Sequence, residues 1–566
     1  MKVTSITTKS GDSIELGKFT LLVGPNNVGK SQTLKDIYRK LTKGHQAETT
    51  ILGAIKVDRP GSFEGLFEGL DVREDLQNVG QYTVDGVTTG SDPNSLIRIH
   101  MEVHKRHFES NHELDNTFLN ISKFRVFYLD SESRLKVASK SQNYIPDASS
   151  PKNFIQALYG TFGEFDGSLR DAFRSTFEMD IMLDYSAGLE LRLAVSHTFE
   201  NIPEDPRRAY PVMRPYPSVE SQGDGFRSFV AVVLTLLLSK DKVVLLDEPE
   251  AFLHPEQARR LGKWISDHTE SFPCQILIAT HNASFLAGLL SGRQPADIYR
   301  LNRIADRTSF TRITSEATRK LSSSPLLSSQ RVLEAIFARG VVVCEADADR
   351  VLYNTVAIKE HDNQEVLFVH AHNKQTIKDV VSLLRDASIP TAGVVDIDIL
   401  NSSKDFAEAL SALGADKTLS EFAALRDEVA AHVESRSESQ VLADIRSRVT
   451  ELLGQLDEDK HTLSGARSAL DRIKSESRRW AELKKRGVNS LEEPFRGKCQ
   501  EIVDGSARCG LFIVPVGELE SWMQLGVRKN RWIVPALEAL DRGDCPDELS
   551  SFVRGMQDFI FPRANR

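Results

Sequence analysis

The chain has 566 residues, of which 40% are hydrophobic and 27% charged, and its formal net charge is −9. The length predicts two or three domains, and the composition is typical of globular proteins. Because the net charge is negative, the surface as a whole does not attract nucleic acid, and any binding of nucleic acid depends on local basic patches. No apolar run approaches the roughly 18 residues of a membrane-spanning helix, and the first residues lack the apolar core of a signal peptide. The five cysteines are scattered and form no CxxC pair, which indicates a protein of the reducing cytoplasm without structural zinc.

The first predicted elements, in residues 1–40, are two strands, a loop and a helix, and the loop is a candidate phosphate-binding loop. Residues 24–31, GPNNVGKS, fit the pattern G-x-x-x-x-G-K-[ST], in which backbone N–H groups wrap phosphate oxygens and the helix adds the positive end of its dipole. We expect Lys30 to reach the β- and γ-phosphates of ATP and Ser31 to ligate Mg²⁺; a plain glycine-rich turn is the alternative. The predicted nucleotide-binding residues of this loop are Gly24, Asn26, Asn27, Gly29, Lys30, Ser31 and Gln32.

Strand signals follow at 124–130, 242–248 and 275–280, and the second of these strands ends in two acidic residues. We expect Asp247 to hold Mg²⁺ indirectly and Glu248 to polarise the water that attacks ATP. A strand that ends in Asp-Glu is usually structural when it stands alone. Together with the phosphate loop, however, it predicts an ATPase.

Two further motifs lie near these strands. The sequence SQGDGFRS (221–228) precedes a strongly apolar predicted helix, and His281 follows the strand at 275–280. They resemble the signature sequence and the switch histidine of ABC-type ATPases, and DEPEAFLHP resembles the heads of SMC and OLD proteins in particular. No sustained heptads precede the signature sequence, so the long coiled-coil arms of SMC proteins are absent. The resemblance implies an ABC-type ATPase domain at 1–311, a catalytic role for His281, and contact with nucleotide on another subunit by Ser221, Gly223 and Gly225.

The Ser/Thr-rich stretch at 312–337 is predicted to be a linker, and a second αβ pattern follows as a domain at 338–566. Helical, highly charged sequence at about 404–490 interrupts this pattern and predicts an inserted hairpin or bundle. Its basic run, 472–486, either grips a phosphate backbone or forms a solvated helix face. Strands of the second domain are predicted at 340–345, 365–371, 391–398 and 510–516.

Three of these strands end in acidic residues. Carboxyl ends of strands in a parallel sheet meet in one crevice, where uncompensated carboxylates repel one another. Mg²⁺ or Mn²⁺, which prefer carboxylate oxygens, would compensate this charge; solvated acidic turns are the alternative. The acidic residues are Glu345 and Asp349, then Asp396 and Asp398 on one face of a strand, and finally Glu518 and Glu520.

The acidic pattern resembles a TOPRIM domain, in which Glu-Gly-x-x-Asp follows one strand and Asp-x-Asp follows a later one. Ala346 replaces the glycine of that pattern, while every carboxylate is in place. The segment HNKQTIKDVVSLL (372–384) resembles the one that follows the second strand in OLD proteins. A basic residue after the last ligand, Lys529 or Arg528, would stabilise transition-state charge. The resemblance implies a catalytic metal site with the ligands Glu345, Asp349, Asp396, Asp398 and Glu520.

An ABC-type ATPase followed by a TOPRIM domain is the architecture of OLD-family nucleases, and it is also similar to the Gabija nuclease subunit, retron-associated OLD effectors and fused PARIS-type proteins. The predicted fold is α/β: an ABC-type P-loop ATPase domain followed by a TOPRIM α/β domain with an inserted helical segment. We predict an ATP-regulated, Mg²⁺-dependent endonuclease that acts on DNA rather than RNA, forms a homo-oligomer through its ATPase heads, and serves bacterial anti-phage defence with a protein or RNA partner from the same operon. Two alternatives stay open: an enzyme that cleaves RNA such as tRNA, and an ATPase sensor or scaffold whose TOPRIM domain is inert.

Overall fold

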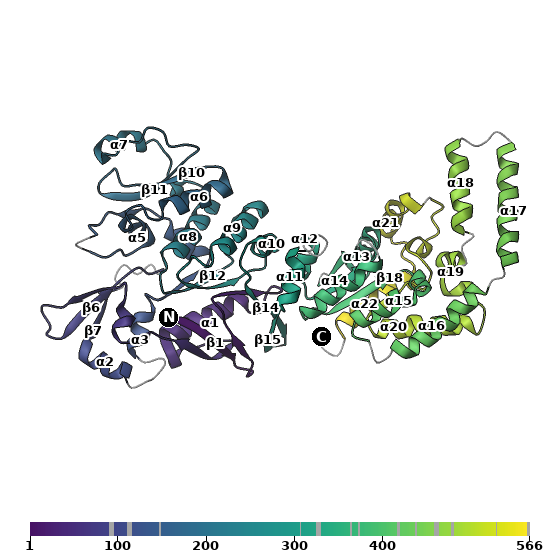
Figure 1. Ribbon diagram of the computed structural model, residues 1–566, viewed down its shortest axis with the longest axis horizontal. Coiled ribbons are helices and arrows are strands. Elements are labelled where there is room, and N and C mark those ends of the chain that lie inside the picture. The colour runs from purple at the N-terminus through teal and green to yellow at the C-terminus, as the bar shows by residue number, and fades with distance from the viewer. Residues whose placement is uncertain are drawn as a thin grey trace. The chain divides into compact units, whose positions relative to one another are not determined.

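The chain forms two compact units, residues 1–337 and residues 338–566, and both contain helices and β-sheets (Figure 1). The α/β fold class predicted from the sequence is therefore confirmed. In the described parts of the chain, no helix combines the length and the apolar character that crossing a membrane requires. The computed structural model describes residues 1–566 apart from 90–95, 110–115, 147–148, 306, 324–329, 363–364, 372–373, 416–418, 436–437, 458–462, 477–479, 528 and 563–566.

A six-stranded sheet with the order β15-β14-β3-β13-β12-β8 forms the centre of the first unit. All its strand pairs are parallel except β14–β15. Every residue of β3, β12 and β13 is buried, as in parallel strands whose two faces are covered. The three strands predicted above are β8, β12 and β13. The six strands are β3 (Phe19–Val23), β8 (Val126–Leu129), β12 (Val243–Asp247), β13 (Gln275–Ala279), β14 (Asp297–Ile304) and β15 (Arg307–Arg312).

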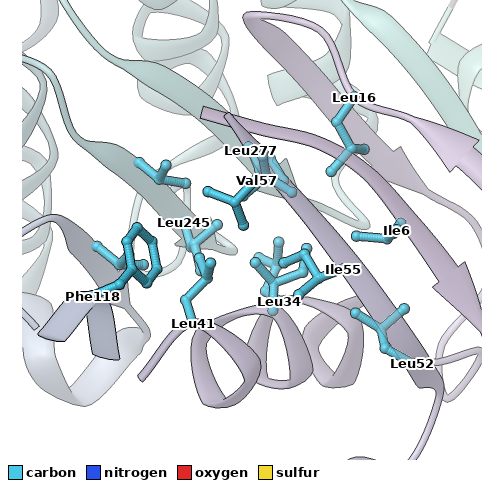
Figure 2. Close-up of a cluster of buried hydrophobic side chains, with 14 of the residues drawn as sticks. Ile6, Leu16, Leu34, Leu41, Leu52, Ile55, Val57, Phe118, Leu245 and Leu277 are labelled. Carbon is cyan, nitrogen blue, oxygen red and sulfur yellow. The ribbon is translucent and has the colours of Figure 1, made fainter. Parts of the chain in front are cut away.

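Helix α1 (Lys30–Lys43) packs against this sheet through one apolar face. Its Leu34 and Leu41 share a core with Leu245 and Leu277 of the sheet and with Ile55 of β4 (Leu52–Asp58) (Figure 2). Leu34 and Leu41 are 0% exposed, and burial of each such side chain contributes about 1.5–3 kcal/mol. This packing fixes the first turn of α1, and therefore the end of the loop that precedes it.

Three small antiparallel sheets, β2-β1-β4, β5-β6-β7 and β10-β11-β9, complete the first unit together with its other helices. The other strands are β1 (Lys2–Thr8), β2 (Ser13–Glu15), β5 (Asp71–Glu74), β6 (Gln81–Asp85), β7 (Ile97–His100), β9 (Ser141–Gln142), β10 (Asp180–Asp184) and β11 (Glu190–Ser196). The other helices are α2 (Met101–Glu109), α3 (Asn116–Ser122), α4 (Ser131–Val137), α5 (Phe154–Gly160), α6 (Asp166–Phe177), α7 (Pro206–Met213), α8 (Asp224–Leu238), α9 (Pro255–His268), α10 (Ala283–Ser291), α11 (Ser315–Ser323) and α12 (Gln330–Ala335).

The stretch 312–337, predicted to be a linker, lies in the first unit and contains α11 and α12. Ala317 and Leu321 of α11 and Val332 and Leu333 of α12 are buried, and both helices contact α10. The burial of these apolar side chains explains why the stretch folds with the unit that precedes it, although its many serines and threonines are typical of a linker.

A parallel four-stranded sheet with the order β17-β16-β18-β19 forms the centre of the second unit. One core joins Val342 and Val394 of this sheet to Tyr353 of α13 and Val553 of α22. All four strands predicted for this part of the chain are present, and because they run the same way, their carboxyl ends share one edge. The strands are β16 (Gly340–Cys344), β17 (Val366–His370), β18 (Thr391–Val395) and β19 (Leu511–Ile513), and the helices around them are α13 (Asp347–His361), α14 (Lys374–Asp386), α20 (Phe495–Arg508), α21 (Ile533–Asp541) and α22 (Asp547–Ile560).

Five helices lie between β18 and α20, where the sequence predicts a helical insertion. Helix α16 contacts α20, whereas α17 and α18 contact each other and project away from the sheet of the second unit (Figure 1). The last helix, α19, returns to the sheet and contacts the 3₁₀ helix η4 (Ile397–Asn401) that follows β18. The five helices are α15 (Ser403–Ala412), α16 (Leu419–Glu434), α17 (Glu438–Asp457), α18 (Leu463–Glu476) and α19 (Ala481–Arg486).

Candidate nucleotide site and candidate metal centre

The predicted phosphate loop connects β3 to α1, and glycine is required at two of its positions. Gly24 has a φ of 136°, and a Cβ atom there would lie 2.4 Å from the carbonyl oxygen of Leu301. Gly29 has a φ of 103°, and its Cβ atom would lie 2.4 Å from Ile51 Cδ1. Both φ values belong to the region that side chains disfavour. The loop conformation therefore depends on these two glycines.

Lys30 is the first residue of α1, and its side chain turns back over the loop. Its Nζ atom donates hydrogen bonds to the carbonyl oxygens of Gly24 (2.8 Å) and Pro25 (2.7 Å). Burial lowers the pKa of Lys30 to about 8. The ammonium group is thus held where the phosphates of a nucleotide are expected. Of the other predicted loop residues, Asn26 and Asn27 are exposed, and Gln32 donates a hydrogen bond to Asp36 (2.8 Å).

The two residues predicted to hold Mg²⁺ at the nucleotide lie next to each other. Ser31 Oγ donates a hydrogen bond to Asp247 Oδ1 (2.7 Å), and the hydroxyl group of Tyr128 donates one to Asp247 Oδ2 (3.1 Å). Burial raises the pKa of Asp247 above its usual value. Ser31, at the start of α1, and Asp247, at the end of β12, therefore supply a hydroxyl group and a carboxylate within reach of one cation. Tyr128 was not predicted.

Glu248 and His281 form the second pair of the nucleotide site. His281 Nδ1 lies 2.7 Å from Glu248 Oε1, and this hydrogen bond lowers the pKa of Glu248 and raises that of His281. The backbone N–H of Glu248 donates to the carbonyl oxygen of Ala279 (2.8 Å), which holds the ends of β12 and β13 together. The predicted base and the predicted switch histidine are thus in direct contact.

The predicted signature residues lie at the start of α8. Gly223 precedes the helix, and a Cβ atom on Gly225 would lie 2.8 Å from the carbonyl oxygen of Phe252. Ser221 is exposed and donates a hydrogen bond to the carbonyl oxygen of Ser218 (2.7 Å). Within the described part of the chain, Ser221 has no hydrogen bond to the phosphate loop, so this structure does not bring the two motifs together.

Sequence reasoning missed Arg134, which lies directly behind the nucleotide site. Its side chain is 0% exposed, and it donates hydrogen bonds to the carbonyl oxygens of Asp247 (2.6 Å) and Glu248 (2.8 Å) and to Ser228 Oγ (2.9 Å). It therefore ties the end of β12 to the signature helix. A local signal exists in the sequence, because Asp130 begins a capping box for α4 directly after β8, but the partners of Arg134 are about 100 residues away in the chain.

At the carboxyl edge of the second unit's sheet, the structure gathers the predicted acidic residues. Glu345 follows β16, and Asp349 lies in the first turn of α13, where it accepts a hydrogen bond from the backbone N–H of Ala346 (2.8 Å). Ala346 has a φ of −127°, which any residue adopts, so the alanine that replaces the glycine of the pattern causes no strain there. The remaining residues are Asp396 after β18, Asp398 in η4, and Glu518 and Glu520 at the 3₁₀ helix η6 (Leu519–Trp522).

These carboxylates repel one another. Burial raises the pKa of Asp396 to about 8, and the negative charges of Glu345, Asp349 and Asp398 add to the shift. Burial and the charges of Glu345 and Glu520 raise the pKa of Asp349 to about 6. A divalent cation would relieve this repulsion, and oxygen donors of this kind suit Mg²⁺ or Mn²⁺. The residues present therefore fit such an ion.

Two lysines pair with these carboxylates. Lys484 Nζ lies 2.6 Å from Asp398 Oδ2 and 3.5 Å from Asp396 Oδ2. Lys529 Nζ lies 2.8 Å from Glu518 Oε2 and 3.2 Å from Glu520 Oε2. Consistent with this pairing, three or more His, Cys, Asp or Glu side chains do not converge on one point in the described residues. Lys529 was predicted at this site, Lys484 was not, and Arg528 lies outside the described residues.

Two segments of the chain match models of known protein families. Residues 19–287 match the family described as "AAA domain, putative AbiEii toxin, Type IV TA system". Residues 336–398 match "Overcoming lysogenization defect protein-like, TOPRIM domain". The chain thus combines an AAA-type ATPase domain with an OLD-like TOPRIM domain. The second match contains Glu345, Asp349 and both aspartates of the Asp-x-Asp pattern, whereas Lys484 and Lys529 lie beyond it.

No curated protein matches the chain. Among solved structures, it is similar to the SMC head bound to the C-winged helix domain of ScpA, at 13% identity and a TM-score of 0.33, over 56% of this chain and 100% of that one. It is also similar to the SMC head domain from Thermotoga maritima, at 12% identity and a TM-score of 0.29, over 56% of this chain and 100% of that one.

Proposed function

We propose that the protein is an ATP-regulated, Mg²⁺-dependent endonuclease of the OLD type that cleaves or nicks nucleic acid. The observation that carries the proposal is the gathering of Glu345, Asp349, Asp396, Asp398 and Glu520 at one edge of a parallel sheet. Buried carboxylates that repel one another are typical of functional sites, and a divalent cation would relieve this repulsion. A solvated acidic turn would not bury Asp349 and hold the pKa of Asp396 so far above its usual value.

In the first unit, ATP would bind at the loop of residues 24–31. Lys30 would exchange the carbonyl oxygens that it now contacts for phosphate oxygens. Ser31 and Asp247 would hold Mg²⁺, which neutralises charge on the transferred phosphoryl group. Glu248 would act as the general base for the attacking water, and its hydrogen bond with His281 would orient the Glu248 carboxylate. Bound nucleotide would regulate the nuclease by changing the geometry of the heads.

In the second unit, Glu345, Asp349, Asp396, Asp398 and Glu520 would hold Mg²⁺ or Mn²⁺. The bound ions supply an activated water and stabilise the leaving oxygen of a phosphodiester. Lys529 lies beside Glu518 and Glu520 and would stabilise the negative charge that develops on the phosphate.

The proposed partners are nucleic acid, DNA rather than RNA, and further copies of the chain. Exposed Ser221, with Gly223 and Gly225, would complete the nucleotide site of a neighbouring subunit, which supports a homo-oligomer through the ATPase heads. A role in anti-phage defence, with a partner from the same operon, rests on analogy with the family alone.

A nicking experiment tests the proposal against its alternatives. Purified full-length protein is incubated with supercoiled plasmid or with tRNA, in Mg²⁺, with and without ATP. We expect nicked plasmid, and ATP to change the rate. Cleavage of tRNA alone would establish the RNA-directed alternative. The other candidate is an ATPase scaffold whose TOPRIM domain is inert. The pairing of Lys484 with Asp398 and of Lys529 with Glu518 favours this candidate, because paired carboxylates have less need of a metal ion. ATP hydrolysis without cleavage of either substrate would support the scaffold.

A further inference from the structure

The last helix of the insertion forms one wall of the candidate metal centre. Helix α19 contacts η4, which carries Asp398. Its Lys484 is partly buried, with 35% of the side chain exposed, and its ammonium group lies 2.6 Å from Asp398 Oδ2 and 3.5 Å from Asp396 Oδ2. The insertion therefore places a positive charge next to Asp396 and Asp398, which are predicted to share a metal ion.

The backbone that carries Lys484 is fixed against the loop that follows β19. A Cβ atom on Gly517, whose φ is 113°, would lie 2.1 Å from the carbonyl oxygen of Lys484. A Cβ atom on Gly487 would lie 1.9 Å from the carbonyl oxygen of Pro515, to which the N–H of Val488 donates a hydrogen bond (2.9 Å). Only glycine allows this close approach on both sides. The position of Lys484 is thus built into the fold rather than left to a loose surface helix.

The neighbouring lysine, Lys485, serves as a control for Lys484. Lys485 has an exposed side chain, and its backbone carbonyl oxygen accepts a hydrogen bond from Ser521 Oγ (3.0 Å). Both lysines belong to the same short helix and carry the same charge. Lys484 contacts the acidic edge and Lys485 is exposed, so the pair provides a matched comparison.

We propose that Lys484 is the resident counter-ion of the Asp396–Asp398 pair, and that a divalent cation displaces its ammonium group when it binds these carboxylates. The inference rests on the metal site of the proposed function. A divalent cation and an ammonium group cannot both contact the same two carboxylates without mutual repulsion. Lys484 therefore weakens metal binding, and the insertion sets the metal concentration at which the site fills.

Mn²⁺ binding to the full chain, without nucleotide, tests this proposal. The electron paramagnetic resonance signal of free Mn²⁺ measures binding directly and does not depend on cleavage. Binding that disappears in Asp396→Asn defines the TOPRIM site. The variants are Lys484→Met, which removes the charge and keeps the chain length, Lys484→Arg, which keeps the charge, and Lys485→Met as the control. Circular dichroism and thermal melting confirm that each variant is folded.

We expect Lys484→Met to bind Mn²⁺ at least about fivefold more tightly than the wild type, because a unit charge about 4 Å away is worth that factor even at the dielectric constant of water. Lys484→Arg and Lys485→Met should stay close to the wild type. Equal or weaker binding by folded Lys484→Met would overturn the proposal while leaving the metal site intact. If neither the wild type nor Lys484→Met bound Mn²⁺ at this site, the metal centre itself, and with it this inference, would be wrong.

Discussion

Arg134 donates a hydrogen bond from Nε to the hydroxyl group of Ser228, 2.9 Å away, and so joins α4 to the helix that begins in the predicted signature sequence. The other end of the same guanidinium group holds the carbonyl oxygens of Asp247 and Glu248. A buried arginine whose partners are all neutral is costly unless its donors are paired. Here the pairing connects the element that would contact a neighbour's nucleotide to the end of β12, where ATP would be hydrolysed.

Arg134→Met should lower the free energy of unfolding by about 3 kcal/mol or more, because it leaves two carbonyl oxygens and a hydroxyl group buried without their donor. The measurement is calorimetric melting of the full chain. The control is Arg207→Met, which removes an arginine whose side chain is 90% exposed and pairs with Asp205; its effect should stay within about 0.5 kcal/mol. Equal effects of the two variants would show that the Arg134 network does not stabilise the fold.

Lys30→Ala should abolish detectable ATP binding, because the loop loses the ammonium group that is held over it. Fluorescent-nucleotide titration measures the affinity. Lys43→Ala, at the exposed far end of the same helix, should bind ATP as the wild type does. A Lys30→Ala variant with wild-type affinity would contradict the assignment of the phosphate loop.

The Glu248–His281 pair predicts a defined pH dependence of stability. The pKa of His281 is raised above 6.5, so its contribution is complete below that pH and is lost as the pH rises through the raised value. The pKa of Glu248 is lowered below 4.5, so its contribution is complete above that pH and is lost as the pH falls. Glu248→Gln should therefore destabilise the protein most between about pH 4.5 and 6.5, and much less at pH 9. Melting curves across this range would contradict the pairing if the difference were constant.

Gly517→Ala should destabilise the second unit by about 2 kcal/mol more than Gly543→Ala does. Both glycines have positive φ, 113° and 87°, so both substitutions strain the backbone. Only at Gly517 would the new Cβ atom meet backbone, 2.1 Å from the carbonyl oxygen of Lys484, whereas nothing lies within 4 Å at Gly543. Urea unfolding measures the difference. Equal losses would mean that α19 is not held against the loop after β19.

Most strands of both central sheets could be predicted because their residues are apolar runs bounded by loops, as β3, β12 and β16 are. Strands β14 and β15 were not predicted, and they contain charged or polar residues and are only partly buried. The pairing of Ser31 with Asp247, and of Glu248 with His281, agrees with the roles assigned to them from the motifs. Strands β5 to β7 were not predicted, since they are short and only partly buried.

The contacts that sequence reasoning missed all depend on the order of elements in space. Tyr128 reaches Asp247 because β8 lies beside β12. Lys484 lies 86 residues from Asp398 in the chain. It belongs to a charged helical stretch in which the sequence does not distinguish a solvated lysine from one that contacts phosphate. Lys484 differs from Lys485 only in the folded chain, where α19 contacts η4 and the Lys484 ammonium group pairs with Asp398.

Paired measurement of plasmid nicking and ATP hydrolysis in the Asp396→Asn variant tests the central claim most directly. Asp386→Asn, which changes an exposed aspartate on α14, is the matched control. If the acidic edge is a metal-dependent nuclease centre, Asp396→Asn loses nicking in Mg²⁺ and in Mn²⁺ while it keeps most of its ATP hydrolysis, and Asp386→Asn keeps both. Nicking at the wild-type rate in Asp396→Asn would contradict the nuclease assignment.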